Sequence, residues 1–283
     1  MGLSVSFGLL AQGTLPNYDI LMYDLAWKEV NEQARLSISN PVVIANSPHY
    51  ENQPNFISNS QLLFTKIVDG NADIWQWQHG EAKPLFETKE SEYSPTPVPF
   101  IKDTYSMIRV EQDGTQRLWQ YDSKGHFNLV FETIKPVGYH VWLEKSIAMF
   151  VLGEPHRLEV TELGNESTKV LDKDIGRCLQ RIPASKAISY TRVVKGKHEM
   201  RKIDFPSQAI SAIGMLPGES QDYTWFGSNY VISAEQDRLL FKNVTDKNSK
   251  WLAVQYDSEL YPDNITRLAI SPDGSKIAIV SHR

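Results

Sequence analysis

The sequence predicts an all-β protein, namely a six-bladed β-propeller with four antiparallel strands in each blade and a last blade closed by both termini. Three observations in the 283 residues lead to this prediction. A segment with the pattern of a β-hairpin occurs six times, two further strand-like segments follow five of the copies, and the strands missing after the sixth copy occur near the N-terminus. Repeats of this length with four strands each are typical of propeller blades.

The recurring segment combines a hydroxyl, amide or acidic residue, a proline or aromatic residue, a turn and an apolar strand. Its equivalent positions are Gln53, Ser94, Tyr139, Gln180, Tyr223 and Thr266. Successive positions in this series are 41, 45, 41, 43 and 43 residues apart. Helical repeats of similar length would place apolar residues three and four positions apart, which these segments do not.

Each of the first five copies is followed by two segments in which apolar and polar residues alternate, as in a β-strand. The first of them reads ADIWQWQ, TQRLWQYD, HRLEVTEL, HEMRKIDF and DRLLFKNV, and the second KPLFET, FNLVFET, STKVLDK, QAISAIG and KWLAVQY. Pairs such as Asp113-Gly114 mark the turns, because glycine tolerates the positive φ that tight turns need. Each unit therefore contains four strands.

The sixth hairpin, LAISPDGSKIAIVSHR, ends the sequence without its third and fourth strands. Two segments near the other end have the matching patterns, NYDILMYDL from Asn17 to Leu25 and NPVVIANS from Asn40 to Ser47. We therefore expect the last blade to combine both termini, which leaves no open sheet edge in the ring. Residues 14–283 are predicted to form this single domain.

The first residues have a different character. MGLSVSFGLLAQG is apolar from Leu3 to Ala11 and is too short to span a bilayer. An apolar run before a small residue is typical of a secretion signal, so residues 1–13 are interpreted as a signal-peptide remnant of a periplasmic or secreted protein. An ordinary buried first strand is the alternative.

Charge and motif content exclude several classes of protein. The formal net charge of −5 disfavours nucleic acid as a partner, since nucleic-acid-binding domains are usually basic. The single cysteine, Cys178, cannot form an internal disulfide. The sequence contains neither a G-x-S-x-G nucleophile motif nor a glycine-rich phosphate loop, and no cofactor is expected.

The predicted closing blade resembles one known family. SPDGSKIAIVSHR, followed across the termini by NYDILMYDL, is similar to the WD40-like repeat of the TolB propeller family. The matching residues are Ser271, Pro272, Asp273, Gly274, Ser281, Arg283, Asp19, Ile20 and Asp24. This resemblance implies the propeller fold and, by analogy alone, an interaction or assembly role in the cell envelope. The other blades keep little of the pattern, and the separate N-terminal domain of the family has no counterpart here.

Candidate binding residues are the side chains expected at the central channel, where the first strand of each blade lies. They are Tyr93, His140, Arg181, Tyr223, Arg267, His49, Glu51, Glu92, Tyr139, Gln180, Asp222 and Trp225. Aromatic residues and arginine are enriched at recognition surfaces, so this set predicts a site for a protein segment or a small ligand. Arg181 and Arg267 are expected to pair with carboxylate or carbonyl groups. Alternatively, these residues are polar only because the channel is hydrated.

A catalytic alternative rests on the acidic residues and histidines of the same set. His49, Glu51, Glu92, His140 and Asp222 could converge on a divalent ion, as in a propeller lyase, lactonase or cyclase. No two of them have the local spacing of a known metal motif. The leading hypothesis is therefore a non-enzymatic binding protein, and the metal-dependent enzyme is the alternative.

Overall fold

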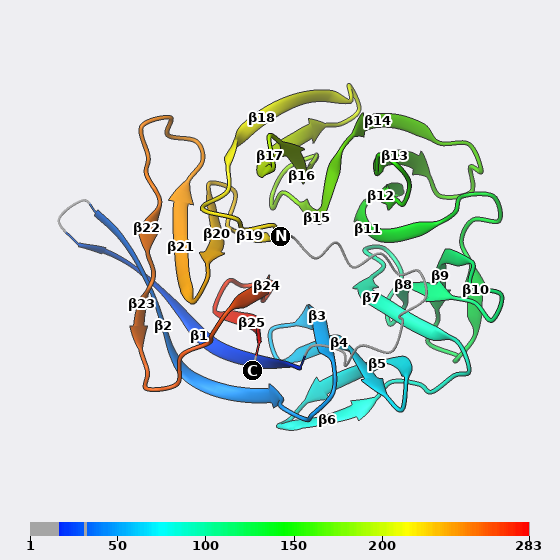
Figure 1. Ribbon diagram of the computed structural model, residues 1–283, viewed down its shortest axis with the longest axis horizontal. Coiled ribbons are helices and arrows are strands. Elements are labelled where there is room, and N and C mark those ends of the chain that lie inside the picture. The colour runs from blue at the N-terminus through cyan, green and yellow to red at the C-terminus, as the bar shows by residue number, and fades with distance from the viewer. Residues whose placement is uncertain (1–16, 31–32, 283) are drawn as a thin grey trace.

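The computed structural model describes residues 17–30 and 33–282, and these residues form strands, turns and loops without a helix. The strands build six sheets around a common axis, which confirms the predicted six-bladed propeller (Figure 1). The predicted signal segment, residues 1–13, lies outside the described residues. In the part of the chain that is described, no helix is long and apolar enough to cross a membrane.

Five blades are each built from one continuous segment, with the first strand nearest the axis (Figure 1). Blade 1 contains β3 (Glu51–Ser58), β4 (Gln61–Val68), β5 (Asn71–Gln78) and β6 (Glu81–Pro84). Blade 2 contains β7 (Ser91–Pro97), β8 (Tyr105–Val110), β9 (Gln116–Tyr121) and β10 (Phe127–Leu129). Blade 3 contains β11 (Val137–Leu143), β12 (Ser146–Val151), β13 (Arg157–Glu162) and β14 (Lys169–Lys173). Blade 4 contains β15 (Ile175–Arg181), β16 (Ala187–Val194), β17 (Lys197–Asp204) and β18 (Ala209–Met215). Blade 5 contains β19 (Tyr223–Phe226), β20 (Tyr230–Glu235), β21 (Arg238–Asn243) and β22 (Leu252–Ala253).

The closing blade joins the two ends of the chain, as predicted. Its inner strands are β24 (Ile265–Ile270) and β25 (Lys276–His282), and its outer strands are β1 (Tyr18–Val30) and β2 (Gln33–Ala45). β25 pairs antiparallel with β1 from Tyr18↔His282 to Asp24↔Lys276. At one end of this pairing the Lys276 ammonium donates to a carboxylate oxygen of Asp24 at 2.6 Å.

A fifth strand on the closing blade was not predicted. KWLAVQY was expected to be the fourth strand of blade 5, but only Leu252 and Ala253 pair there, with β21. The chain then crosses to the closing blade, where β23 (Gln255–Asp257) pairs parallel with β2. Val254, between the two short strands, is buried in the apolar cluster that blade 5 shares with the closing blade. This segment therefore ties the two blades together.

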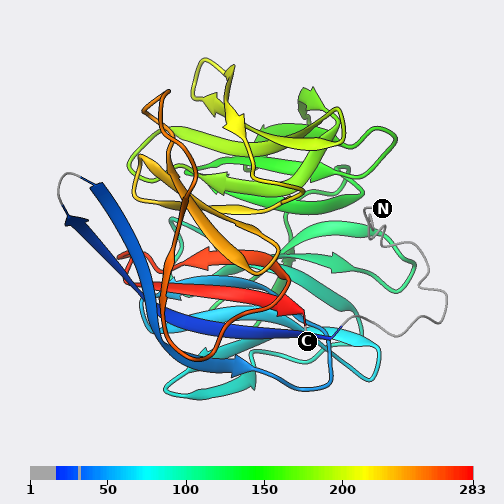
Figure 2. The same ribbon diagram turned by 60° about the vertical axis from the view of Figure 1, so that its left-hand side comes forward.

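β1 and β2 are also longer than predicted, at 13 residues each. They continue past the predicted ends at Leu25 and Asn40 as a hairpin beside blade 5 (Figures 1 and 2). Trp27 on this extension packs against Phe226 and Tyr230 of blade 5, with ring centroids 5.7 and 4.6 Å apart. The extension therefore adds a second contact between the closing blade and its neighbour.

The innermost strands bend where they pass the axis. Register shifts that mark β-bulges occur in the first strands of blades 1, 2, 3 and 4 and of the closing blade. In blades 1 and 2 the bulge contains a residue with positive φ, Gln53 (58°) and Ser94 (56°). The sequence pattern predicts that these two positions are equivalent, and their matching places in the bulges confirm it. A bulge re-aims side chains, so it decides which residues face the channel.

Neighbouring blades are held by five buried apolar clusters and by a repeated polar contact. The indole Nε1 of Trp142 on β11 donates to the hydroxyl of Ser106 on β8 at 2.8 Å. Trp225 on β19 makes the same 2.8 Å bond to Ser189 on β16. Because each bond satisfies a buried donor across two blades, it fixes the position of one blade against the next.

The Ser-Pro-Asp-Gly turn of the closing blade tests the blade assignment. Gly274 has φ +74°, and a Cβ there would lie 3.3 Å from the ring of Phe226. Gly274→Val therefore combines a disfavoured backbone conformation with a steric clash, and we expect the free energy of unfolding to fall by about 1–3 kcal/mol. Urea unfolding measures the change. Pro272→Val, an exposed substitution in the same turn, should stay within about 0.5 kcal/mol of the parent. Equal stability of the two variants would contradict this turn.

Candidate functional site

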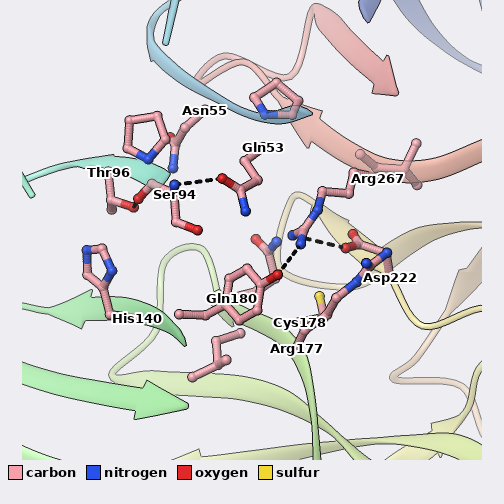
Figure 3. Close-up of a pocket in the computed structure, with 15 residues that line it drawn as sticks. Gln53, Asn55, Ser94, Thr96, His140, Arg177, Cys178, Gln180, Asp222 and Arg267 are labelled. Atoms are coloured by element: carbon pink, nitrogen blue, oxygen red, sulfur yellow. Dashed lines mark hydrogen bonds and ion pairs between the residues drawn. The ribbon is translucent and has the colours of Figure 1, made fainter. Parts of the chain in front are cut away.

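The first strands enclose a cavity on the propeller axis, which we call the channel cavity (Figure 3). Its volume is about 90 Å³ and all six blades contribute to its lining. The lining residues are Gln53, Pro54, Asn55, Ser94, Pro95, Thr96, Tyr139, His140, Arg177, Cys178, Leu179, Gln180, Asp222, Arg267 and Leu268. Most of them have polar side chains, so the cavity can hold a polar group.

Arg267 of the closing blade contacts two other side chains that line the cavity. Its Nη2 donates to the hydroxyl of Tyr139 at 2.8 Å, and its guanidinium carbon lies 4.9 Å from the centroid of that ring (Figure 3). Its Nη1 lies 3.8 Å from a carboxylate oxygen of Asp222. Blade 3, blade 5 and the closing blade thus meet at one guanidinium group.

A second guanidinium group belongs to Arg177 of blade 4. Its Nη2 donates to the backbone carbonyl of Thr266 at 3.0 Å. Burial raises the pKa of Asp222, while the nearby guanidinium groups of Arg267 and Arg177 oppose that rise. The cavity therefore holds two guanidinium groups and one carboxylate.

His140 lines the cavity as a neutral imidazole, because burial lowers its pKa to about 3. Its Nε2 lies 2.6 Å from the hydroxyl oxygen of Ser106, which itself accepts the bond from Trp142. The same hydroxyl donates to the backbone carbonyl of Thr96 at 3.2 Å. Among the described residues, Nδ1 has no hydrogen-bond partner.

Blades 1 and 2 meet at the side chain of Gln53. Its amide oxygen accepts hydrogen bonds from the hydroxyl of Thr65 and from the backbone N–H of Ser94, each at 2.8 Å (Figure 3). The positive φ at Gln53 and Ser94 brings these groups together at the bulges. This contact fixes the blade 1 and blade 2 side of the cavity.

The structure brings five of the predicted site residues to this cavity. They are Tyr139, His140, Gln180, Asp222 and Arg267. The remaining candidates lie elsewhere, and their positions have structural reasons. No described group of three or more His, Cys, Asp or Glu side chains is placed to hold a metal ion, so the predicted ligand set does not converge.

Three of the displaced candidates are aromatic. Tyr223 and Trp225 are 0% and 6% exposed, and they lie in the apolar cluster between blades 4 and 5. Tyr93 packs against the cluster between blades 2 and 3. Contrary to the prediction, these side chains face neighbouring blades rather than the channel mouth.

The two polar candidates at strand ends are also outside the cavity. Arg181 is the last residue of β15 and is exposed to solvent. His49 precedes β3 and is partly exposed. The segment GRCLQR contributes Arg177, Cys178, Leu179 and Gln180 to the cavity, whereas Arg181 lies just beyond them at the exposed end of β15.

Glu51 and Glu92 are fully buried in ion pairs with the second strands of their own blades. Glu51 lies 3.0 Å from the Lys66 ammonium, which in turn lies 4.7 Å from the centroid of the Trp75 ring. Blade 2 repeats this arrangement with Glu92, Arg109 and Trp119. The shared pattern indicates that these acids stabilise the innermost strands, and the sequence alone did not reveal their partners.

Comparisons with known proteins add information about the fold. No family model matches the sequence, and no curated protein matches it either. A protein of Agrobacterium tumefaciens assigned as a TolB has a similar structure, with a TM-score of 0.69, 12% identity and coverage of 95% of this chain and 99% of that one. TolB of Acinetobacter baumannii is similar with a TM-score of 0.58 and 12% identity, and the match covers 93% of this chain and 64% of that one. A chain of a nidogen/laminin complex is similar with a TM-score of 0.64 and 9% identity, and the match covers 89% of this chain and 97% of that one. At these identities the comparisons establish the fold alone.

Burial raises the pKa of Glu92 to about 7, although hydrogen bonds from Thr88 and Arg109 favour its charged form. Since the folded protein then holds this proton more tightly than the unfolded chain, the contribution of Glu92 to stability decreases as pH rises from about 4.5 to about 7. Relative to the parent, the free energy of unfolding of Glu92→Gln should therefore increase by about 1–3 kcal/mol as pH rises across this interval, as measured by urea unfolding.

Glu111→Gln is the matched control for this titration. A hydrogen bond from Arg117 lowers the pKa of Glu111, so its stabilising effect is lost only on acidification. Its stability difference from the parent should be constant above about pH 5. A difference for Glu92→Gln that is equally constant would show that Glu92 is ionised throughout.

Proposed function

We propose that this protein is a non-enzymatic β-propeller that binds a protein segment or a small ligand at the channel face, as an interaction protein similar to TolB. The observation that supports this best is the channel cavity, where polar side chains from all six blades surround one small volume. We include export to the periplasm or the exterior in the proposal, on the basis of the apolar run from Leu3 to Ala11.

The structural neighbours support binding rather than catalysis as the role of such a ring. One of them is a chain from a complex of nidogen with laminin, and two others are TolB proteins. Transfer of a partner-binding role from them is part of our proposal and rests on the fold, and the channel cavity supports it as the candidate site in this chain.

The metal-dependent enzyme has less support. Two of its proposed ligands, Glu51 and Glu92, are bound by Lys66 and Arg109. His140 and Asp222 line the cavity from different blades, and Asp222 is engaged with Arg267. Binding therefore explains the arrangement of the polar groups more directly than metal catalysis does.

Selection of ligands followed by blockage of the cavity tests this proposal. Displayed peptides of about 12 residues and a library of small molecules are selected against the purified protein. Gln180→Trp, which fills the cavity from β15, should then weaken the selected ligands at least tenfold in Kd. Arg181→Trp, at the next and exposed position of the same strand, should leave Kd unchanged.

The melting temperatures of both variants control for folding. Ligands that bind Gln180→Trp as tightly as the parent would place the binding surface outside the channel, and the proposed function would fail.

A further inference from the structure

We propose that the channel cavity binds a carboxylate group between Arg177 and Arg267. This inference rests on the proposed function and names the chemical group that the ligand or partner presents at the centre of the ring. It is carried by the charge of the lining side chains, by their unpaired donors and by the size of the cavity.

The charges that face the cavity do not cancel. The guanidinium groups of Arg177 and Arg267 contribute two positive charges, and Asp222 contributes one negative charge. His140 is neutral, and burial raises the pKa of the Cys178 thiol, which is therefore neutral as well. A monoanion would complete the balance, whereas a buried excess charge without a counter-ion is costly.

Hydrogen-bond donors point to the same class of ligand. The Nε–H groups of Arg177 and Arg267 are buried, and neither finds a partner within the described residues. Because a buried donor without an acceptor destabilises the protein, a ligand whose acceptor oxygens reach the guanidinium groups of these two arginines would stabilise them.

The size and shape of the groups favour a carboxylate over a larger anion. A cavity of about 90 Å³ has room for several water molecules, or for one carboxylate with a short carbon chain. Guanidinium groups match the planar, two-oxygen geometry of a carboxylate. A phosphate would bring nearly two negative charges to a site with an excess of one.

Acetate and propionate are the first probes, measured by calorimetry and by the rise in melting temperature at constant ionic strength. Both should bind with millimolar Kd, as expected for ligands with so few atoms. Sulfate and chloride should bind at least tenfold more weakly than acetate. Equal binding of sulfate, or no binding of either carboxylate, would overturn the proposal.

Tetra-alanine with a free or an amidated C-terminus distinguishes the source of the carboxylate. Tighter binding of the free peptide than of acetate, with no binding of the amide, supports a chain terminus as the natural group. Binding of acetate with no binding of either peptide supports a free small carboxylate. Equal binding of the two peptides would contradict recognition of the terminal carboxylate.

Variants separate electrostatic recognition from a change in folding. Arg177→Gln and Arg267→Gln should each raise the Kd for acetate at least tenfold, whereas Asp222→Asn should lower it several-fold because it removes the competing negative charge. Arg181→Gln, at an exposed position on the same strand as Arg177, should leave the Kd for acetate unchanged. If Arg267→Gln does not fold, Arg177→Gln and Asp222→Asn decide the question. Weaker acetate binding in Asp222→Asn would overturn the proposal.

Failure of this inference can be told apart from failure of the proposed function. Selected ligands that lose affinity for Gln180→Trp, while acetate does not bind the parent, would leave the proposed function intact and refute the carboxylate site. Acetate binding that depends on Arg177, with no ligand sensitive to Gln180→Trp, would support the carboxylate site and refute the proposed function.

Discussion

The pairing of β1 with β25 is the interaction on which the rest of the structure depends. Lys276 and Asp24, which are 252 residues apart in sequence, meet at one end of this pairing. Each blade buries its apolar faces only against its neighbours, so an open ring would expose both sheet edges and core surface. The channel cavity depends on the same closure. Arg267 lies on the closing blade, and only the closed ring brings it to the cavity beside Arg177 of blade 4.

The six-bladed ring could be predicted from the sequence because strand alternation and turn residues are local signals. The same signals located the closing blade, since the patterns at the two ends complement each other. The crossing of β23 could not be predicted in this way, because parallel pairing with Ser37–Ser39 depends on which strand edge is free in the folded ring. The extension of β1 beyond Leu25 likewise depends on the apolar surface that blade 5 offers to Trp27.

The candidate site was predicted less well, for a reason specific to β-sheets. A shift of one residue in register turns a side chain to the other face, and most innermost strands contain a bulge. In β15, which contains such a shift, consecutive residues from Arg177 to Gln180 line the cavity, and Arg181 lies outside it. Glu51 and Glu92 showed no sign of burial in the sequence, because their cationic partners lie 15 and 17 residues away on the second strands.

Native-state hydrogen exchange tests most directly whether the two termini close a single cooperative ring. The account predicts that backbone amides in β1 and β25 exchange only through global unfolding, with the same free energy of opening as amides in the innermost strands of blades 2 and 4. Opening of β1 at a much lower free energy, with the other blades still protected, would show that the N-terminal strand is a peripheral addition and would contradict the account.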